Sequence, residues 1–372
     1  MRLLITGGGT GGHIYPALAI AKGYLQQHPG AEVLYVGTKN GLEADIVPKA
    51  GIPFATVTVE GLRRKVSLQT LIFGAKLAKG LVEARKVIKE FQPDLVVGTG
   101  GYVCGPVVYL AAKMGIPTLI HEQNAYPGIT NKLLSRVVNH VAVTFADSIP
   151  YFRQAKAITH TGLPIREEIL LTNREQGLQA MRLDPNKKLL LVTGGSRGAR
   201  SINQAMPEVL SELANRRDIQ VVHITGQFDY EQAVERTSQA GIDSQSEGNI
   251  TIVPYLYNMA DAMAAADLII CRAGATTLAE VTAKGIPAIL IPYPYASENH
   301  QEHNASSLVK VGAAKMILDR DLDGQVLRVQ VLQLLEEVES LAKMKEASLS
   351  LGRPQALQDI LQIMNKLTGI ST

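Results

Sequence analysis

The sequence predicts an α/β protein of two similar halves, each built on a parallel sheet that helices cover on both faces. Its 372 residues exceed the size at which a single hydrophobic core usually stops growing. Residues 3–21 have the pattern of an apolar strand, a turn with five glycines and an amphipathic helix, and residues 189–199 repeat that order. Short apolar runs also alternate with helical patterns along both halves, as a covered parallel sheet requires.

The composition excludes several classes of protein. A net charge of +3 argues against a nucleic-acid groove spread over the surface, so we expect no nucleic-acid partner. Cys104 and Cys271 lie far apart, which predicts neither a disulfide framework nor a zinc site and fits a reducing cytosol. We find no signal-peptide pattern and no run of about 18 uninterrupted apolar residues, and therefore expect a soluble or peripheral protein.

The first half contains apolar runs bounded by turn residues. Beyond the first strand, we expect strands at 32–37, 54–59, 94–98, 117–121 and 140–144, and a helix at 42–49. Ligands of parallel sheets bind at the carboxyl ends of the strands. The loops of interest are therefore 7–13, 99–105, 121–131 and 145–149.

The glycine and proline of residues 161–165 precede a charged segment that starts at Arg166, and they mark the domain junction. We expect a first domain over 1–163 and a second over 164–353. Strands of the second half are expected at 189–193, 220–225, 250–253, 267–271 and 288–291. Helices should follow over 325–349 and 354–366, and the last segment, 354–372, should pack back on the first domain.

The motif Gly7-x-Gly9-x-x-Gly12 lets a backbone approach an anion, but it also fits any tight strand-to-helix turn. A nicotinamide-binding protein would need an acidic residue at the end of the second strand to hold the ribose. That strand ends in Val-Gly-Thr-Lys at 36–39, with Glu32 at its other end. The second glycine turn, 194–199, lacks the Gly-Lys-Ser/Thr of a phosphate loop. Neither a dehydrogenase nor an ATPase is predicted.

Residues 267–280 again have the pattern of a strand, a small-residue loop and a helix start. The N–H groups of Ala275 to Thr277 would face outward at the positive end of that helix, where a pyrophosphate can bind. Glu280, one turn further, could accept hydrogen bonds from both hydroxyls of a ribose. Thr277-x-x-Glu280 also fits a capping box, which would hold the helix end without a ligand. Spacing alone favours the cap slightly.

Six stretches carry a more specific signal: residues 7–17, 98–106, 121–124, 194–199, 271–280 and 299–301. In this order and with these gaps they closely resemble the MurG family of peptidoglycan N-acetylglucosaminyltransferases. The resemblance implies a GT-B architecture, two Rossmann-like domains facing across a cleft. It also implies transfer of N-acetylglucosamine from UDP-GlcNAc to the C4 hydroxyl of the muramoyl sugar of lipid I, which gives lipid II with inversion at the anomeric carbon.

Three alternatives remain open. A UDP-GlcNAc 2-epimerase shares the architecture and the donor, another GT-B UDP-sugar transferase would differ in substrate, and a nucleotide-binding module would bind without catalysis. The epimerase would need further carboxylates and no lipid-facing patch.

The resemblance implies a UDP-GlcNAc site drawn from both domains, without a cofactor. Its members in the first domain are Thr10, Gly11, Gly12 and Asn124, the last of them at the sugar. Its members in the second domain are Arg166 and Ser196 at the diphosphate, Leu256 at the uracil, Ala275, Thr276, Thr277, Leu278, Ala279 and Glu280 at the phosphates and ribose, and Gln301 at the sugar. Arg197 stands where the family often has Gln, and its role is left open.

The transfer needs a base near the acceptor hydroxyl. His13 is the first candidate, because the positive end of its helix disfavours the imidazolium and leaves the ring able to accept a proton. Its alternative role is a hydrogen bond at the helix end. Glu122 is the second candidate. We expect no metal, with the departing UDP stabilised by helix N-termini and Arg166.

Residues 62–82 combine basic and apolar side chains. The basic ones are Arg63, Arg64, Lys65, Lys76 and Lys79, and the apolar ones are Leu68, Leu71, Ile72, Phe73 and Leu77. This pattern is more commonly that of a sheet-covering helix with a solvated face. Because the implied acceptor is lipid-linked, we expect instead contact with an anionic bilayer, to which each cation contributes about 1 kcal/mol. The protein should be peripheral on the cytoplasmic face of the plasma membrane, with other cell-wall synthesis proteins as partners.

Overall fold

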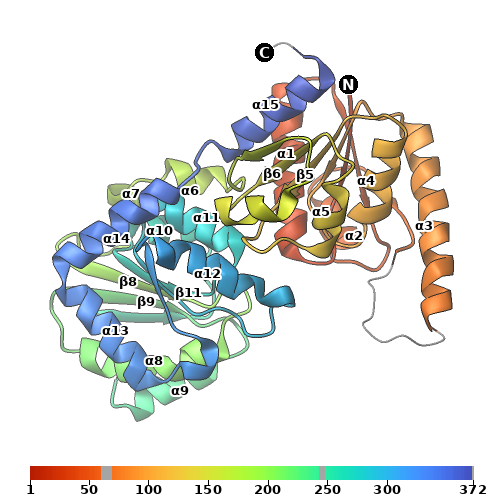
Figure 1. The fold of residues 1–372 in the computed structure, drawn as a ribbon. Coiled ribbons are helices and arrows are strands. Elements are labelled where there is room, and N and C mark those ends of the chain that lie inside the picture. Colours follow the sequence, from red (N-terminus) through yellow and green to blue (C-terminus); the bar gives the residue numbers. More distant parts are fainter. Residues whose placement is uncertain (60–68, 243–247, 371–372) are drawn as a thin grey trace. The chain divides into compact units, whose positions relative to one another are not determined.

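The computed structural model describes residues 1–59, 69–242 and 248–370, with the backbone alone for residues 69–77. The chain divides into two compact units, which Figure 1 shows by colour along the sequence. Unit 1 is Met1–Ile165 together with Pro354–Thr372, and unit 2 is Arg166–Arg353. The division lies two residues beyond the boundary expected from the sequence.

Unit 1 is built on a parallel sheet of seven strands in the order β3-β2-β1-β4-β5-β6-β7. The strands are β1 (Arg2–Thr6), β2 (Glu32–Gly37), β3 (Phe54–Thr56), β4 (Leu95–Gly98), β5 (Thr118–Glu122), β6 (His140–Val143) and β7 (Ile158–His160). The chain changes direction across the sheet between β1 and β4. In a parallel sheet, the loops at such a reversal leave a crevice at the carboxyl ends of the strands.

Helices cover both faces of this sheet. They are α1 (Gly11–Gln27), α2 (Glu43–Lys49), α3 (Gln69–Phe91), α4 (Cys104–Lys113), α5 (Ile129–Leu134) and α15 (Ala356–Thr368), with a 3-10 helix at Ala146–Phe152. Leu3 and Ile5 of β1 face a core with α1 and α15, whereas Leu4 faces a second core with α4. This alternation is what a sheet buried on both sides requires. The C-terminal helix α15 thus belongs to the core of unit 1.

Unit 2 repeats the plan with six parallel strands in the order β10-β9-β8-β11-β12-β13. The strands are β8 (Lys188–Thr193), β9 (Ile219–Ile224), β10 (Ile250–Val253), β11 (Leu268–Cys271), β12 (Ala288–Leu290) and β13 (Ala314–Met316). The helices are α6 (Glu167–Leu171), α7 (Arg174–Ala180), α8 (Arg200–Leu213), α9 (Tyr230–Gln239), α10 (Met259–Ala265), α11 (Ala275–Lys284), α12 (His300–Lys310), α13 (Gly324–Glu336) and α14 (Val338–Leu351). The expected α/β class with two parallel sheets is confirmed.

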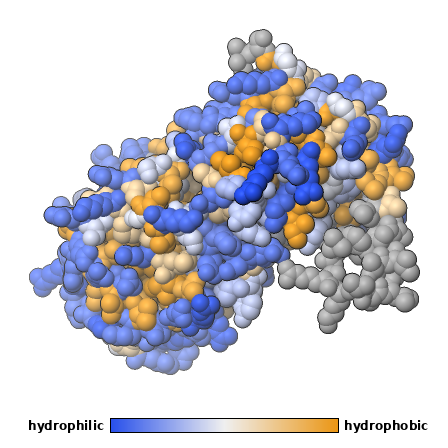
Figure 2. Space-filling view, in the orientation of Figure 1, coloured by the Kyte–Doolittle hydropathy of each residue, from blue (hydrophilic) through white to orange (hydrophobic). Residues whose placement is uncertain are grey.

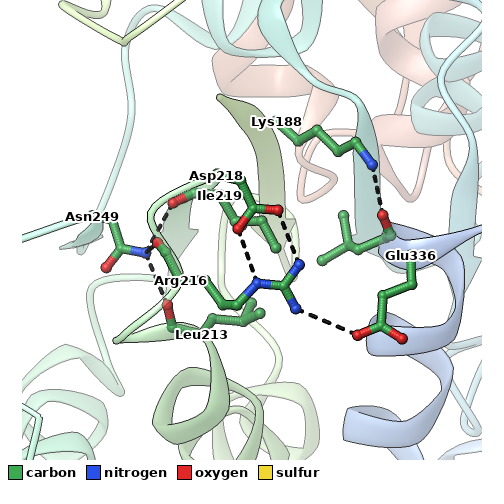
Figure 3. A network of polar contacts seen from close by, with 8 residues as sticks. Lys188, Leu213, Arg216, Asp218, Ile219, Asn249 and Glu336 are labelled. Atoms are coloured by element: carbon green, nitrogen blue, oxygen red, sulfur yellow. Dashed lines mark hydrogen bonds and ion pairs between the residues drawn. The ribbon is translucent and has the colours of Figure 1, made fainter. Parts of the chain in front are cut away.

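A polar network ties the amino ends of β8 and β9 to the neighbouring helices (Figure 3). The Arg216 guanidinium donates to both carboxylate oxygens of Asp218 at 2.9 Å and, more weakly, to Glu336 at 3.4 Å. The Asn249 side-chain amide donates to the carbonyls of Leu213 and Ile219, at the end of α8 and the start of β9. The network therefore stabilises the amino ends of the strands. The second glycine turn lies at their opposite, carboxyl ends.

Three details of the sequence-based prediction were wrong. The edge strands β7 and β13 were not predicted, and each has only three residues. The helix expected over 325–349 is two helices, because Glu337 between α13 and α14 adopts φ −85° and ψ 79°. No glycine or proline marks that break.

On the face shown in Figure 2, hydrophilic side chains predominate and apolar ones lie between them, as on most folded proteins.

Candidate active site

The candidate residues of unit 1 lie at the carboxyl ends of two strands, β1 and β5, which flank β4 in the sheet. Thr10 is the N-cap of α1, and Gly11, Gly12 and His13 are the first three residues of that helix. Asn124 lies in the loop that follows β5. The N–H groups in the first turn of a helix have no carbonyl partner within the helix, and its positive end attracts anions.

Part of the first glycine turn is occupied by a carboxylate of the chain itself. Glu43 Oε2 accepts a hydrogen bond from Gly9 N at 3.1 Å, and Oε1 accepts from Thr38 N and Oγ1 at 3.0 and 2.6 Å. Although burial acts to raise it, the pKa of Glu43 is lowered by these hydrogen bonds. A Cβ at Gly8 would lie 2.6 Å from this carboxylate. The anion bound at Gly9 is therefore the Glu43 carboxylate. Only the part of the turn at the start of α1 remains a candidate for binding UDP-GlcNAc.

The imidazole of His13 is held from β4 and β5. Its Nδ1 atom lies 3.0 Å from Gln123 Oε1, and the Thr99 hydroxyl donates to the His13 carbonyl at 2.8 Å. Gly100 packs under the ring with φ +109°, where an added Cβ would lie 2.8 Å from Nδ1. Only glycine fits at that position. The half-buried ring is thus fixed in place before any substrate binds.

Glu122 is almost fully buried, and four donors engage its carboxylate. Oε1 accepts from Asn124 N at 3.0 Å and Asn124 Nδ2 at 3.4 Å, while Oε2 accepts from Gly128 N at 3.2 Å and Asn131 Nδ2 at 2.8 Å. A carboxylate has about four lone-pair sites, and here the protein engages both oxygens with two hydrogen bonds each. This geometry suits Glu122 to shaping the loop that carries Asn124.

Unit 2 contains a cavity of about 610 Å³ at the carboxyl ends of β8 and β11. Its walls are the second glycine turn, the start of α11 and the loop that follows β12. Three of the residues predicted to bind UDP-GlcNAc line this cavity: Ser196, Thr277 and Gln301. Arg197 lines it as well. Leu256 is half-buried in the loop after β10 and is not part of this lining.

Ala275 to Glu280 form the first six residues of α11. The N-cap of this helix is Gly274, which has no side chain, so the alternative of a Thr277–Glu280 capping box is wrong. Glu280 instead accepts a hydrogen bond from Arg166 Nε at 2.9 Å. Burial raises the pKa of the Glu280 carboxyl, and the hydrogen bond and charge of Arg166 oppose that rise.

The side chain of Gln301 joins two walls of the cavity. Its Oε1 atom accepts from Ala273 N at 3.1 Å and from Tyr293 N at 2.9 Å. Its Oε1 oxygen is thus engaged by the protein, and the amide N–H₂ is the part that can serve a ligand.

A polar cluster in the same cavity wall was missed by sequence reasoning. The Arg272 guanidinium pairs with Asp319 and donates to Ser201 Oγ at 2.9 Å, and it lies 5.7 Å from the centroid of the Tyr293 ring. Ser201 Oγ donates to Asp319 Oδ1 at 2.6 Å. Arg272 directly follows β11, which placed it at the correct end of the sheet, but nothing in the sequence indicated its distant partners.

Three carboxylates cluster in the sequence at 319–323, and each has a partner in the structure. Arg272 pairs with Asp319, Arg320 lies 3.7 Å from Asp321, and Asp323 caps α13 by accepting from Val326 N. Within residues 1–59, 69–242 and 248–370, no three His, Cys, Asp or Glu side chains are placed to hold a metal ion.

The basic and apolar patch expected at 62–82 lies mostly outside the described side chains. Of its named residues only Lys79 is described, exposed and 3.8 Å from Glu83. No helix in the described part of the chain has the length and apolarity needed to cross a bilayer.

Comparison with known proteins gives consistent matches over the whole chain. Residues 3–143 match the glycosyltransferase family 28 N-terminal domain, and residues 189–360 match the C-terminal domain of that family. The chain is 54% identical over 367 residues to the UDP-N-acetylglucosamine--N-acetylmuramyl-(pentapeptide) pyrophosphoryl-undecaprenol N-acetylglucosamine transferase of Desulforamulus reducens, covering 99% of each chain. It is 56% identical over 363 residues to the protein of that name in Desulfitobacterium hafniense strain Y51, covering 98% of each. The crystal structure of Acinetobacter baumannii MurG superimposes with a TM-score of 0.81 at 32% identity, over 98% of this chain and 99% of that one.

Proposed function

The chain belongs to the MurG group of glycosyltransferase family 28, and on that premise we propose that it makes lipid II from lipid I. It transfers N-acetylglucosamine from UDP-GlcNAc to the C4 hydroxyl of the muramoyl sugar. The observation that carries this proposal is the identity of 54 to 56% to transferases of this name over nearly the full length of both chains.

Unit 2 holds the nucleotide in this proposal. The N–H groups of Ala275 to Thr277 donate hydrogen bonds to the diphosphate, and Ser196 and Arg166 bind it as well. The positive end of a helix favours such an anion. Glu280 holds the ribose, Leu256 offers backbone groups to the uracil, and Gln301 binds the sugar. The cavity beside the second glycine turn and the uncapped start of α11 support these roles.

Unit 1 supplies the base and further donor contacts from Thr10, Gly11, Gly12 and Asn124. The Nε2 atom of His13 takes the proton of the C4 hydroxyl as that oxygen bonds to the anomeric carbon. The bond from the anomeric carbon to the UDP oxygen breaks, and its electron pair leaves with UDP. Attack opposite to the leaving group inverts the anomeric centre. The helix N-termini and Arg166 stabilise the charge on UDP.

Membrane association is part of the proposal. The acceptor is lipid-linked, and the sequence of residues 62–82 contains five cationic residues among apolar ones. We place the protein peripherally on the cytoplasmic face of the plasma membrane.

The testing experiment incubates the full-length protein with UDP-GlcNAc, with and without lipid I. We expect UDP release only with lipid I, together with a lipid-linked disaccharide. N-acetylmannosamine formed without lipid I would establish an epimerase instead. Transfer from a different UDP-sugar in preference to UDP-GlcNAc would establish another donor specificity.

A further inference from the structure

We propose that Gln123 and His121 are positioning residues that hold His13 in the tautomer with its proton on Nδ1, which leaves Nε2 free to accept a proton. This inference rests on the proposed function, in which His13 is the base. It adds two residues with no assigned role, both from the carboxyl end of β5.

The chain of hydrogen bonds starts at a backbone carbonyl. His121 Nε2 lies 2.8 Å from Gly162 O, and a carbonyl oxygen can only accept, so Nε2 carries a proton. His121 is fully buried, and burial lowers its pKa to about 4, so the ring is neutral at physiological pH. In a neutral ring only one nitrogen is protonated, and His121 Nδ1 is therefore an acceptor.

The orientation of the Gln123 amide follows from its two neighbours. Its Nε2 atom lies 3.0 Å from His121 Nδ1 and 3.0 Å from His121 O. Both of those atoms accept hydrogen bonds, so the amide must present its N–H₂ to them. The backbone carbonyl alone would enforce this orientation, because two oxygens would otherwise face each other.

The remaining amide atom decides the tautomer of His13. Gln123 Oε1 lies 3.0 Å from His13 Nδ1, and an amide oxygen has no proton to donate. His13 Nδ1 must therefore carry the proton, and the lone pair of the neutral ring is on Nε2. Gln123 is 2% exposed, so bulk water does not compete for this contact. A fixed tautomer is the usual contribution of a group behind a catalytic imidazole.

The alternation of side chains along the strand end separates this chain of bonds from the Glu122 site. His121 and Gln123 bond to each other, whereas the Glu122 carboxylate between them in sequence bonds to Asn124, Gly128 and Asn131. Successive side chains of a strand point to opposite faces. Residues 121–123 thus have two roles. Glu122 holds the loop that carries Asn124, and His121 and Gln123 orient His13.

The experiment compares the full-length wild type with Gln123→Leu, Gln123→Glu and Asn139→Leu. The ¹⁵N shifts of the imidazole report which nitrogen of His13 is protonated, with His13→Gln used to assign the signal. Gln123→Leu removes the acceptor. Gln123→Glu keeps an oxygen towards Nδ1, and its second oxygen bonds to His121 as the O–H of the protonated acid. Asn139→Leu is the matched control, because that amide pairs with Thr118 at the opposite end of β5.

We expect the Nδ1-protonated tautomer in the wild type, the control and Gln123→Glu, and a mixture in Gln123→Leu. The kcat of Gln123→Leu should fall on the order of tenfold to a hundredfold, with less than a twofold change in the KM for UDP-GlcNAc, and Gln123→Glu should recover part of it. A proton on Nε2 of His13 in the wild-type spectrum would overturn the proposal. An unchanged tautomer in Gln123→Leu would overturn it too. Full transfer by His13→Gln would instead defeat the base assigned under the proposed function, while the tautomer measurement would still decide the roles of Gln123 and His121.

Discussion

Arg166 and Glu280, two residues expected at the donor, are bonded to each other at 2.9 Å. The Glu280 side chain is 8% exposed and that of Arg166 is 47% exposed, so the pair joins a buried carboxylate to a guanidinium at the surface. Breaking such a pair without replacement is costly, because it leaves a buried charge unpaired. Ribose hydroxyls at Glu280 and phosphate oxygens at Arg166 would replace the lost contacts on both sides.

Glu280→Ala should weaken UDP binding about tenfold to a hundredfold, because a ribose hydroxyl loses a charged acceptor. Titration calorimetry with UDP measures the change. Glu168→Ala is the matched control, since Glu168 also bonds to Arg166, at 3.0 Å, but is 60% exposed and contributes little. Equal UDP affinity in Glu280→Ala and wild type would remove Glu280 from the site.

His13→Gln should lower kcat by about a hundredfold or more at unchanged thermal stability, because it removes a proton acceptor from a half-buried position. Glu122→Gln should instead lower the melting temperature, because an amide N–H₂ would face the donors on Gly128 and Asn131. The two variants are compared by lipid II formation and calorimetry. The reverse assignment, with Glu122 as the base, would follow from a normal kcat in His13→Gln and a folded, inactive Glu122→Gln.

Charge reversal at Arg63, Arg64 and Lys65 should reduce binding to anionic vesicles and spare turnover of a detergent-soluble acceptor. Each cation near the bilayer contributes about 1 kcal/mol, so three reversals remove most of the electrostatic attraction. Vesicle flotation measures the binding. Unchanged flotation would place the membrane contact elsewhere.

Asn249→Ala should lower the free energy of unfolding by about 1 to 3 kcal/mol, because carbonyls at the end of α8 and the start of β9 lose their donor (Figure 3). Its affinity for UDP should not change, because the network lies at the amino ends of the strands. Urea denaturation and UDP titration test the two halves of this prediction. A large loss of UDP affinity in the folded variant would contradict the assignment of ligand binding to the opposite strand ends.

The unfolding free energy should fall as the pH drops from 6.5 towards 4, in part because of His223. Burial lowers the pKa of this histidine to about 4, so below pH 6.5 the unfolded chain binds a proton that the folded chain does not. The contribution of His223 to the free energy of unfolding is therefore complete above pH 6.5. Between pH 6.5 and 4 it is lost at about 1.4 kcal/mol per pH unit. His223→Gln should show a smaller difference between urea midpoints at pH 7.5 and 5, and an unchanged difference would contradict the prediction.

The sequence predicted correctly those elements whose conformation depends on neighbouring residues. The long apolar strands, the glycine turns and the start of α11 each have a pattern within a few neighbouring residues, and the family resemblance supplied the reaction. The strands β7 (Ile158–His160) and β13 (Ala314–Met316) were missed because each includes polar residues, whereas the equally short β12 is an apolar run.

The polar contacts of the site could not be predicted in the same way, because their partners are far apart in the chain. His13 and Gln123 are separated by 110 positions, and Arg166 and Glu280 by 114. The alternative of a capping box at Thr277 and Glu280 failed for a local reason: α11 begins at Ala275, so Thr277 is its third residue and cannot be the N-cap. Glu43 at the first glycine turn is a similar case, since a motif shows that an anion fits but not which anion it is.

A crystal structure of the protein with UDP-GlcNAc tests the account most directly. We predict the diphosphate at the first turn of α11 beside Ser196, and the ribose on Glu280 with its bond to Arg166 replaced. A diphosphate bound instead at the first glycine turn of unit 1, with the Arg166–Glu280 bond intact, would contradict the account.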